Sequence, residues 1–283
     1  IHERKKIQDY TYEVAASWVA MGLNLTNAVL YKQSQIPEIL ELTWILSCFA
    51  PKGLMNRAHA YKAAVQQNKD NQREEDERVS MGLYNYPILM TADILIGSAN
   101  FVPVGSDQLQ HLEIARDIAA SFNRTYGNTL TLPSPETGSS KSSLIPGIDG
   151  RKMSKSYDNH IPLFLPEKKL RKLIMRIKTD SMPPEAPKDP HSSIIFQLYQ
   201  LVASEQEVLQ FQDRFIKGIS WGEAKEELFQ KLNDSLEGPR EKYNELMGDK
   251  SKIDDILATG AEKIRPRAQK LLAQVRKKIG ITA

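Results

Sequence analysis

The stretch that decides the fold class is residues 8–50, QDYTYEVAASWVAMGLNLTNAVLYKQSQIPEILELTWILSCFA. Apolar side chains recur at helical spacing over residues 8–22, which predicts an amphipathic helix. The apolar segment 28–31 is short enough for a buried strand, and Pro37 stands where a second helix, over residues 37–50, can begin. A helix, a strand and a helix in quick succession predict an α/β domain with a parallel sheet.

A further strand and helix are predicted downstream. Residues 101–105 (FVPVG) predict a short strand that ends at a glycine, and Ser106 or Asp107 can cap the helix that follows. The apolar side chains of that helix form one stripe, namely Leu109, Leu112, Ala115, Ile118, Ala119 and Phe122. The segment 127–151 is rich in Gly, Pro, Ser and Thr, which predicts a long surface connection. The polar segment 66–78 is either a solvated loop or an exposed helix start.

From Pro166 to the C-terminus the pattern is helical throughout. A basic helix begins at Pro166, and a proline-rich loop follows at 182–190. The later signals are two capping boxes and a set of breaks: Ser204 with Glu207, Ser220 with Glu223, Gly238-Pro239, Gly248 and Gly260. The change in pattern predicts two domains, an α/β domain over residues 1–165 and an all-helical domain over residues 166–283.

The composition is that of a soluble globular protein, with 41% apolar and 26% charged residues among 283. No apolar run approaches the length of a bilayer span and no signal-peptide pattern opens the chain, so neither a membrane nor secretion is expected. The single Cys48 lies in an apolar stretch without a disulfide partner. It is predicted to be a reduced core residue of a cytoplasmic protein.

The net charge of +3 does not by itself indicate a nucleic-acid partner. The C-terminal end is more basic, with nine Lys and Arg against three acidic residues from Lys250 onward. Such a cluster is typical of phosphate contacts, but also of helix C-termini, where cations offset the helix dipole. No Cys/His cluster has metal-ligand spacing, so a structural zinc site is not expected.

The segment that points to chemistry is residues 150–156, GRKMSKS. Lys152 and Lys155 are three apart on a loop of small residues, so both can reach one anion, and Ser154 and Ser156 add hydroxyl donors. Donors aimed in advance at a polyphosphate stabilise the charge that develops when it leaves. For an arbitrary Lys-x-x-Lys pair, a solvated basic loop is the commoner alternative.

The string Lys152-Met153-Ser154-Lys155-Ser156 resembles the signature loop of class I aminoacyl-tRNA synthetases. The segment from Tyr86 to Leu95 is similar to the amino-acid pocket of bacterial tryptophanyl-tRNA synthetases. The segment 103–108 (PVGSDQ) is similar to the nucleotide-side helix start of the same family, and Gln33-Ser34 also fits its pattern. The resemblance implies a Rossmann-like nucleotide-binding domain over residues 1–165.

For tryptophan, the resemblance implies that Asp93 accepts the indole N–H, the one polar handle on a large apolar side chain. Met90, Val102 and Val104 would line the ring. Tyr86 and Gln108 would hold the ammonium and carboxylate of the amino acid. Alternatively, Asp93 only pairs with a lysine or caps a turn. His111, beside the apolar stripe, is predicted to be structural.

For ATP, the resemblance implies contacts at a helix start, from Gly105, Ser106 and Asp107. Asp107 is equally well explained as a plain N-cap. Lys152 and Lys155 would hold the leaving pyrophosphate. The loop residues assigned to ATP are Lys152, Met153, Ser154, Lys155 and Ser156.

The resemblance implies a cytoplasmic homodimeric enzyme that activates L-tryptophan with ATP and Mg²⁺ and loads it onto tRNA(Trp), with residues 166–283 binding the anticodon. A tyrosyl-tRNA synthetase or a non-catalytic paralogue are the alternatives. The second family signature, (H/T)-I-G-(H/N) after the first strand, is not found in the sequence. The first strand and half of the ATP site are therefore expected to be missing from the chain as given, which would be inactive alone.

Overall fold

The computed structural model describes residues 4–105, 108–136 and 145–281. The chain divides into two compact units that each combine separate stretches of sequence. The first, here the helical unit, comprises residues 1–28 and 142–253, and the second, the sheet unit, comprises residues 29–141 and 254–283. The boundary expected near residue 165 lies inside the helical unit. The assignment of a catalytic and an anticodon-binding domain stays a prediction.

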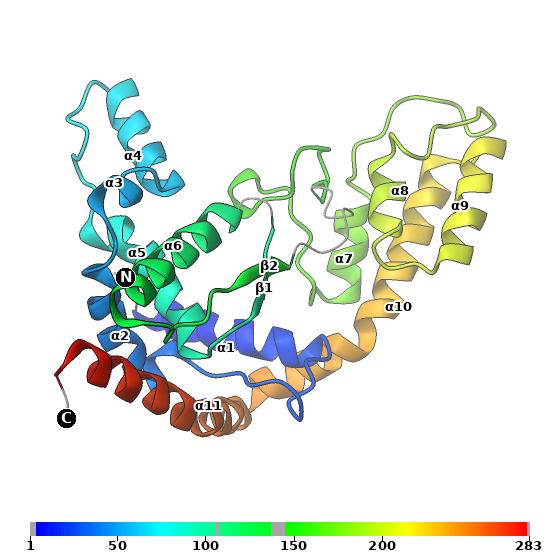
Figure 1. Ribbon diagram of the computed structural model, residues 1–283. Helices are drawn as coiled ribbons and strands as arrows, with labels where there is room; N and C mark the ends of the chain where they lie inside the picture. Colours follow the sequence, from blue (N-terminus) through cyan, green and yellow to red (C-terminus); the bar gives the residue numbers. More distant parts are fainter. Residues whose placement is uncertain (1–3, 106–107, 137–144, 282–283) are drawn as a thin grey trace. The chain divides into compact units, whose positions relative to one another are not determined.

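The sheet unit is built around helix α5, which packs against α2 and α6 (Figure 1). Apart from the C-terminal helix described below, its helices are the 3₁₀ turn η1 (Gln33–Gln35), α2 (Glu38–Ser47), α3 (Lys52–Met55), α4 (His59–Asp70), α5 (Met81–Ile96) and α6 (Leu109–Tyr126). Helix α5 carries almost only apolar residues, and seven of its residues are buried. The predicted helices over 37–50 and after residue 107 are confirmed, and the end of α4 leaves residues 71–78 as a loop.

The sheet of this unit has two parallel strands, β1 (Phe101–Pro103) and β2 (Ser134–Glu136), with Phe101 opposite Ser134. The predicted strand at 101–105 and the parallel pairing are confirmed. The prediction of a plain surface connection over 127–151 is wrong for β2. Its residues have no strand-like alternation, and they form a strand because their backbone bonds to that of β1 and its neighbours, as in Ser134 N–H to Asn100 O at 2.8 Å.

The predicted strand at 28–31 is also wrong, because this segment pairs with no strand in the part of the chain that the structure describes. The backbone of Leu30 lies instead against Gly260 in helix α11 (Lys250–Ile279). A Cβ at Gly260 would collide with the Leu30 carbonyl, so the glycine provides room for the chain. Helix α11 runs through Gly260 without a break, contrary to the expected interruption.

The basic C-terminal helix α11 is bound within the sheet unit through several of its cations. Arg276 forms a bidentate ion pair with Glu41 of α2. The guanidinium groups of Arg265 and Arg267 donate to the backbone carbonyls of Gln35 and Ser98, at 3.0 and 3.4 Å. Part of the basic cluster is therefore structural.

Cys48 is exposed, so the prediction of a core cysteine is wrong. The buried side of α2 carries Leu42, Ile45 and Leu46. Cys48 follows Trp44 by four residues, which directs both side chains to the opposite, exposed side of the helix.

The helical unit contains α1 (Arg4–Ala20), the turn η3 (Lys155–Tyr157), α7 (Glu167–Ile174), α8 (Ile194–Tyr199), α9 (Glu205–Lys217) and α10 (Trp221–Gly248). Helix α10 packs against α1, α7 and α8 (Figure 1). Both predicted capping boxes are present, at the starts of α9 and α10. The break expected at Gly238-Pro239 does not occur, because α10 continues through both residues.

Two structural absences hold within the described ranges. None of the helices found there combines the length and hydropathy that a bilayer span needs. Nor does the same part of the chain hold a group of three or more His, Cys, Asp and Glu side chains placed as metal ligands would be.

Candidate active site

One face of helix α5 carries three of the residues assigned to the amino-acid pocket. Tyr86, Met90 and Asp93 follow one another at intervals of four and three residues, which aligns them along one side of the helix. All three are partly buried. The structure therefore gathers an aromatic hydroxyl, an apolar side chain and a carboxylate on a single surface of the sheet unit.

The Asp93 carboxylate is held by Gln33, which sequence reasoning did not place in the site. The Gln33 amide Nε2 donates to both carboxylate oxygens, at 2.9 and 2.8 Å. Burial raises the pKa of the Asp93 carboxyl, and the Gln33 hydrogen bond opposes part of that rise. A carboxylate offers about four lone-pair positions. Asp93 can therefore accept a further N–H while Gln33 orients it.

Met90, Val102 and Val104 pack against the same small apolar cluster, formed by Ile94, Leu112 and Ala115. Val102 lies in β1 and Val104 directly follows the strand, and both side chains are partly buried. The three residues predicted to line the ring thus come together, although they come from two elements of the chain. An apolar wall of this kind suits a flat hydrophobic ligand.

Tyr86 is oriented by His111 on the neighbouring helix α6. Its hydroxyl lies 3.0 Å from His111 Nε2, and the two rings meet edge to face. His111 is buried, at 7% exposure.

Gln108 is the N-cap residue of α6, and its backbone N–H donates to Gly105 O at 3.0 Å. Ser106 and Asp107, assigned to ATP, lie outside the described residues.

The lysine loop, residues 145–159, belongs to the helical unit. It folds back on itself through the pairing of Pro146 with Lys152 and through Met153 N–H to Ile145 O at 2.8 Å. Met153 packs against the core of the helical unit, whereas Lys152 and Lys155 are exposed. The loop is therefore anchored by its methionine, and the two flanking cations are directed to solvent.

The side chain of Asn159 holds this loop together and was not recognised from the sequence. Its Nδ2 donates to Asp149 Oδ1 at 2.7 Å and to Lys152 O at 3.1 Å. Its Oδ1 accepts the Ser154 N–H at 2.8 Å. Buried polar side chains with this many partners fix a backbone shape. Only its position three residues after Ser156 could have signalled it.

Asp149 and Arg151 complete the loop. Their side chains form an ion pair at 2.7 Å, and the Arg151 guanidinium lies over the ring of Tyr157. Hydrogen bonds from Asn159 and Arg151 lower the pKa of the Asp149 carboxyl to about 2. Asp149 is therefore ionised at neutral pH and can act as a fixed acceptor inside the loop.

Comparison with known proteins identifies the family to which these features belong. A family model described as tRNA synthetases class I (W and Y) matches residues 2–237. The chain belongs to this family. The pocket residues on α5 and the lysine loop both lie within the matched range, so the resemblance predicted from the sequence is confirmed at the level of the family.

Several similar proteins are tryptophan--tRNA ligases. The chain is 50% identical over 281 residues to a tryptophan--tRNA ligase of Neisseria meningitidis, covering 99% of this chain and 83% of that protein. It is 49% identical to one of Pseudomonas aeruginosa, covering 98% of this chain and 62% of that protein. A crystal structure of tryptophanyl-tRNA synthetase from Campylobacter jejuni, complexed with ADP and tryptophan, is 40% identical, with a TM-score of 0.87 over 99% of this chain and 85% of that one.

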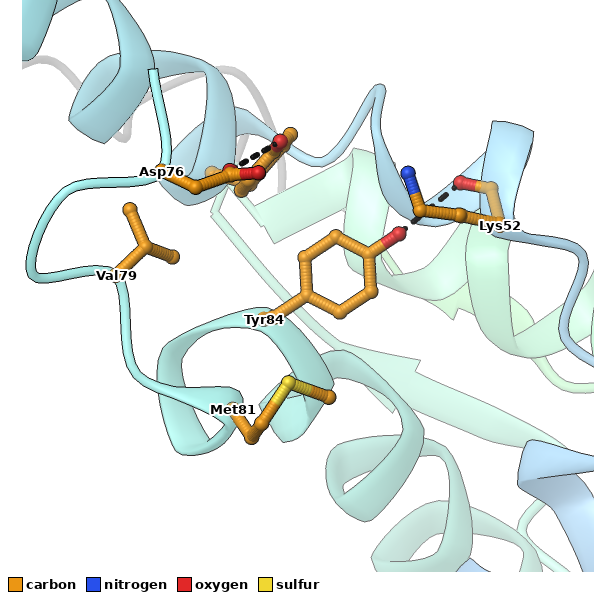
Figure 2. A pocket seen from close by; sticks show the side chains of 6 residues that line it. Lys52, Asp76, Val79, Met81 and Tyr84 are labelled. Atoms are coloured by element: carbon orange, nitrogen blue, oxygen red, sulfur yellow. Dashed lines mark hydrogen bonds between the residues drawn. The ribbon is translucent and has the colours of Figure 1, made fainter. Parts of the chain in front are cut away.

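A separate cavity of 230 Å³ in the synthetase lies among α3, α4, α5 and the loop after α4 (Figure 2). Tyr61 and Tyr84 meet edge to face there, and the Tyr61 hydroxyl donates to Asp76 at 2.7 Å. That hydrogen bond raises the pKa of Tyr61 to about 12. None of the residues predicted to bind tryptophan or ATP lines this cavity, and the sequence assigned no chemistry to its loop.

Proposed function

We propose that this protein is a tryptophan--tRNA ligase, which activates L-tryptophan with ATP and transfers it to tRNA(Trp). The observation that carries the proposal is the partly buried Asp93 carboxylate. It lies on the same face of α5 as Met90, and the Gln33 side chain orients it. A large apolar ring with one N–H donor matches this combination. The names of the relatives agree with tryptophan as the substrate.

Selectivity for tryptophan over phenylalanine follows because the buried Asp93 carboxylate needs an N–H donor from the ligand. If phenylalanine entered the pocket, the Asp93 carboxylate would lose water and gain no donor. Sites built to hydrogen-bond one substrate group reject analogues that lack it by about 10⁴–10⁵-fold. In the proposed site, Met90, Val102 and Val104 line the indole, and Tyr86 and Gln108 hold the ammonium and carboxylate end.

In the first step, a tryptophan carboxylate oxygen attacks the α-phosphorus of ATP. The bond from that phosphorus to the bridging oxygen breaks, and pyrophosphate leaves with tryptophanyl-adenylate remaining. No protein nucleophile is needed, because positioning and charge stabilisation supply the acceleration. Lys152 and Lys155 neutralise the charge that develops on the leaving group, while Gly105, Ser106 and Asp107 bind the nucleotide. Mg²⁺ supplied with ATP would add to this stabilisation of the phosphate charge.

In the second step, a ribose hydroxyl at the 3′ end of tRNA(Trp) attacks the mixed anhydride and AMP leaves. Residues 166–283 bind the tRNA at its anticodon, as the sequence predicts, through the exposed cations of α11. Binding through phosphate contacts weakens as salt concentration rises. The proposed function implies a cytoplasmic location.

The proposed enzyme is a homodimer. Support comes from an exposed apolar stripe on α2, where Leu40, Trp44 and Cys48 recur every fourth residue, and Trp44 is 74% exposed. Exposed apolar stripes commonly mark protein interfaces. The variant Trp44→Lys is expected to sediment as a monomer. A dimer that persists would exclude this stripe as the interface.

The direct test is amino-acid-dependent exchange of labelled pyrophosphate into ATP by the full-length protein. Tryptophan should support exchange, and tyrosine at the same concentration should not. Exchange with tyrosine alone would indicate a tyrosyl-tRNA synthetase instead. Tryptophan binding without exchange would indicate a non-catalytic paralogue.

A further inference from the structure

Asn159 occupies the centre of the lysine loop. It lies just after η3, is 1% exposed, and its side chain has three hydrogen-bond partners within ten residues. Its backbone carbonyl also accepts the Ile148 N–H at 3.0 Å. The loop therefore wraps around one amide side chain, which contacts both of its limbs.

The space around this amide is closed by Gly147. A Cβ at Gly147 would collide with the Asn159 side chain and its carbonyl, so the two segments approach as closely as backbone allows. A close approach of this kind requires a glycine. The amide consequently has little freedom to change partners while the loop keeps this shape.

The bonds of Asn159 act on the backbone on both sides of Met153. Its Nδ2 fixes the direction of the Lys152 carbonyl, and its Oδ1 fixes the Ser154 N–H. Ser154 Oγ then accepts the Ser156 N–H and caps η3, whose first residue is Lys155. The orientation of one buried side chain is thereby transmitted to the backbone that bears each lysine.

We infer that Asn159 is a positioning residue, which sets the directions in which Lys152 and Lys155 present their ammonium groups to a polyphosphate. The inference rests on the proposed function, since that function gives the lysines their ligand. Misplacing a charge by about 1 Å can cost on the order of 10²-fold in rate. A residue that never touches the nucleotide can therefore control the step in which pyrophosphate leaves.

Three measurements on the full-length protein test this role. Asn159→Ala should lower kcat/KM for ATP in pyrophosphate exchange by about 10- to 100-fold, and should weaken calorimetric binding of inorganic pyrophosphate. Tryptophan affinity without ATP should change by less than about twofold. The matched control is Asn68→Ala, because Asn68 is also buried and its Nδ2 also donates to two loop carbonyls, those of Glu75 and Glu77. The control should lose stability but keep its exchange kinetics.

Exchanging the side chains of Asn159 and Asp149 separates an effect on lysine positioning from an effect on stability. In Asn159→Asp the introduced carboxylate would repel that of Asp149, and adding Asp149→Asn supplies an amide donor between the two positions. The double variant should regain thermal stability over Asn159→Asp. It should not regain exchange activity, because the Lys152 carbonyl still lacks its donor. Full recovery of activity together with stability would overturn the inference.

A mutant cycle and the wild type complete the test. In a background that carries both Lys152→Ala and Lys155→Ala, Asn159→Ala should have a much smaller effect than in the wild type, because its effect acts through these two lysines. Additive losses, or unchanged pyrophosphate binding in Asn159→Ala, would contradict the role of Asn159. Absence of tryptophan-dependent exchange in the wild type would contradict the proposed function instead.

Discussion

Asp93 is a carboxylate whose surroundings oppose its charge. Burial raises its pKa, while the Gln33 amide provides two hydrogen bonds that favour the ionised form. Burial and the charge of Asp93 together also raise the pKa of the nearby Tyr31 phenol. Groups with shifted pKa values in partly buried positions are common in binding sites. Asp93 combines such a shift with a fixed orientation, as recognition of one N–H requires.

Replacing Asp93 by asparagine should damage selectivity more than stability. The variant Asp93→Asn removes the charge that burial opposes, but one of its two polar atoms becomes a donor directed at the Gln33 amide. Discrimination between tryptophan and phenylalanine, measured as the ratio of kcat/KM in pyrophosphate exchange, should fall by about tenfold or more. Asp117→Asn, an exposed change on α6, is the control. Unchanged discrimination would remove Asp93 from the pocket.

Lys155, the first residue of η3, tests the role assigned to the lysine loop. Lys155→Ala should slow adenylate formation by about 10²-fold or more, the usual cost of losing one aimed donor in a transition state. Single-turnover kinetics measures that step, and fluorescence titration measures tryptophan affinity, which should stay nearly constant. Lys169→Ala on α7 removes an equally exposed lysine and should change neither. Equal losses in rate and affinity would mean that Lys155 only supports the fold.

At the scale of elements, Gly260 decides how the segment 28–31 packs against α11. Gly260→Ala gains about 1 kcal/mol of helix propensity, but its Cβ collides with the Leu30 carbonyl, and overpacking typically costs about 1–3 kcal/mol. The collision is with backbone and should win, so the free energy of unfolding should fall in urea titrations. Gly222→Ala in α10 places its Cβ no nearer than 4.0 Å to another group and should be neutral or stabilising. A stabilised Gly260→Ala would show that Leu30 moves freely.

The start of α9 should respond to acid. Glu207, the third residue of α9 and the partner of the N-cap Ser204, bonds to Lys231 and to Ser204, which lowers the pKa of Glu207 from 4.5 to about 2. A carboxyl whose pKa is lowered by folding stabilises the folded state at pH values above its ordinary pKa of 4.5. That stabilisation is lost as the pH falls from 4.5 through about 2. Glu207→Gln should therefore show a smaller fall of Tm over this range than the wild type. Glu205→Gln, on the same turn, should follow the wild type.

Across the whole molecule, the cations of the basic C-terminal end fall into two groups, one paired within the protein and one exposed. Arg265, Arg267 and Arg276 hold α11 to its own unit, whereas Lys277 and Lys278 are exposed. Structural pairing therefore explains the three arginines, and phosphate contact is proposed only for the exposed lysines.

That division predicts different outcomes for neighbouring positions. Replacing Lys277 and Lys278 by alanine should weaken tRNA(Trp) binding and reduce the slope of log K against log salt by about 1 for each phosphate that is no longer neutralised. Stability should not change. Arg276→Ala should lower the Tm slightly and leave the salt slope as it is, because it breaks a surface pair with Glu41. An unchanged salt slope in the lysine variant would place the tRNA elsewhere.

Local sequence pattern predicted the helices over residues 8–22, 37–50, after residue 107 and after Pro166, the strand at 101–105, the capping boxes and the family, because periodicity, caps and motifs are properties of neighbouring residues. Helices α3, α4 and α5 were not predicted. Tertiary structure alone decided that Ser134–Glu136 becomes a strand, that 28–31 does not, that Cys48 faces outward, and that Gln33 and Asn159 orient the predicted residues. Each of these depends on which backbone or side chain lies opposite. Strand pairing, burial and hydrogen-bond partners depend on residues that are distant in the sequence and meet only when the chain folds. The pattern of neighbouring residues therefore does not predict them.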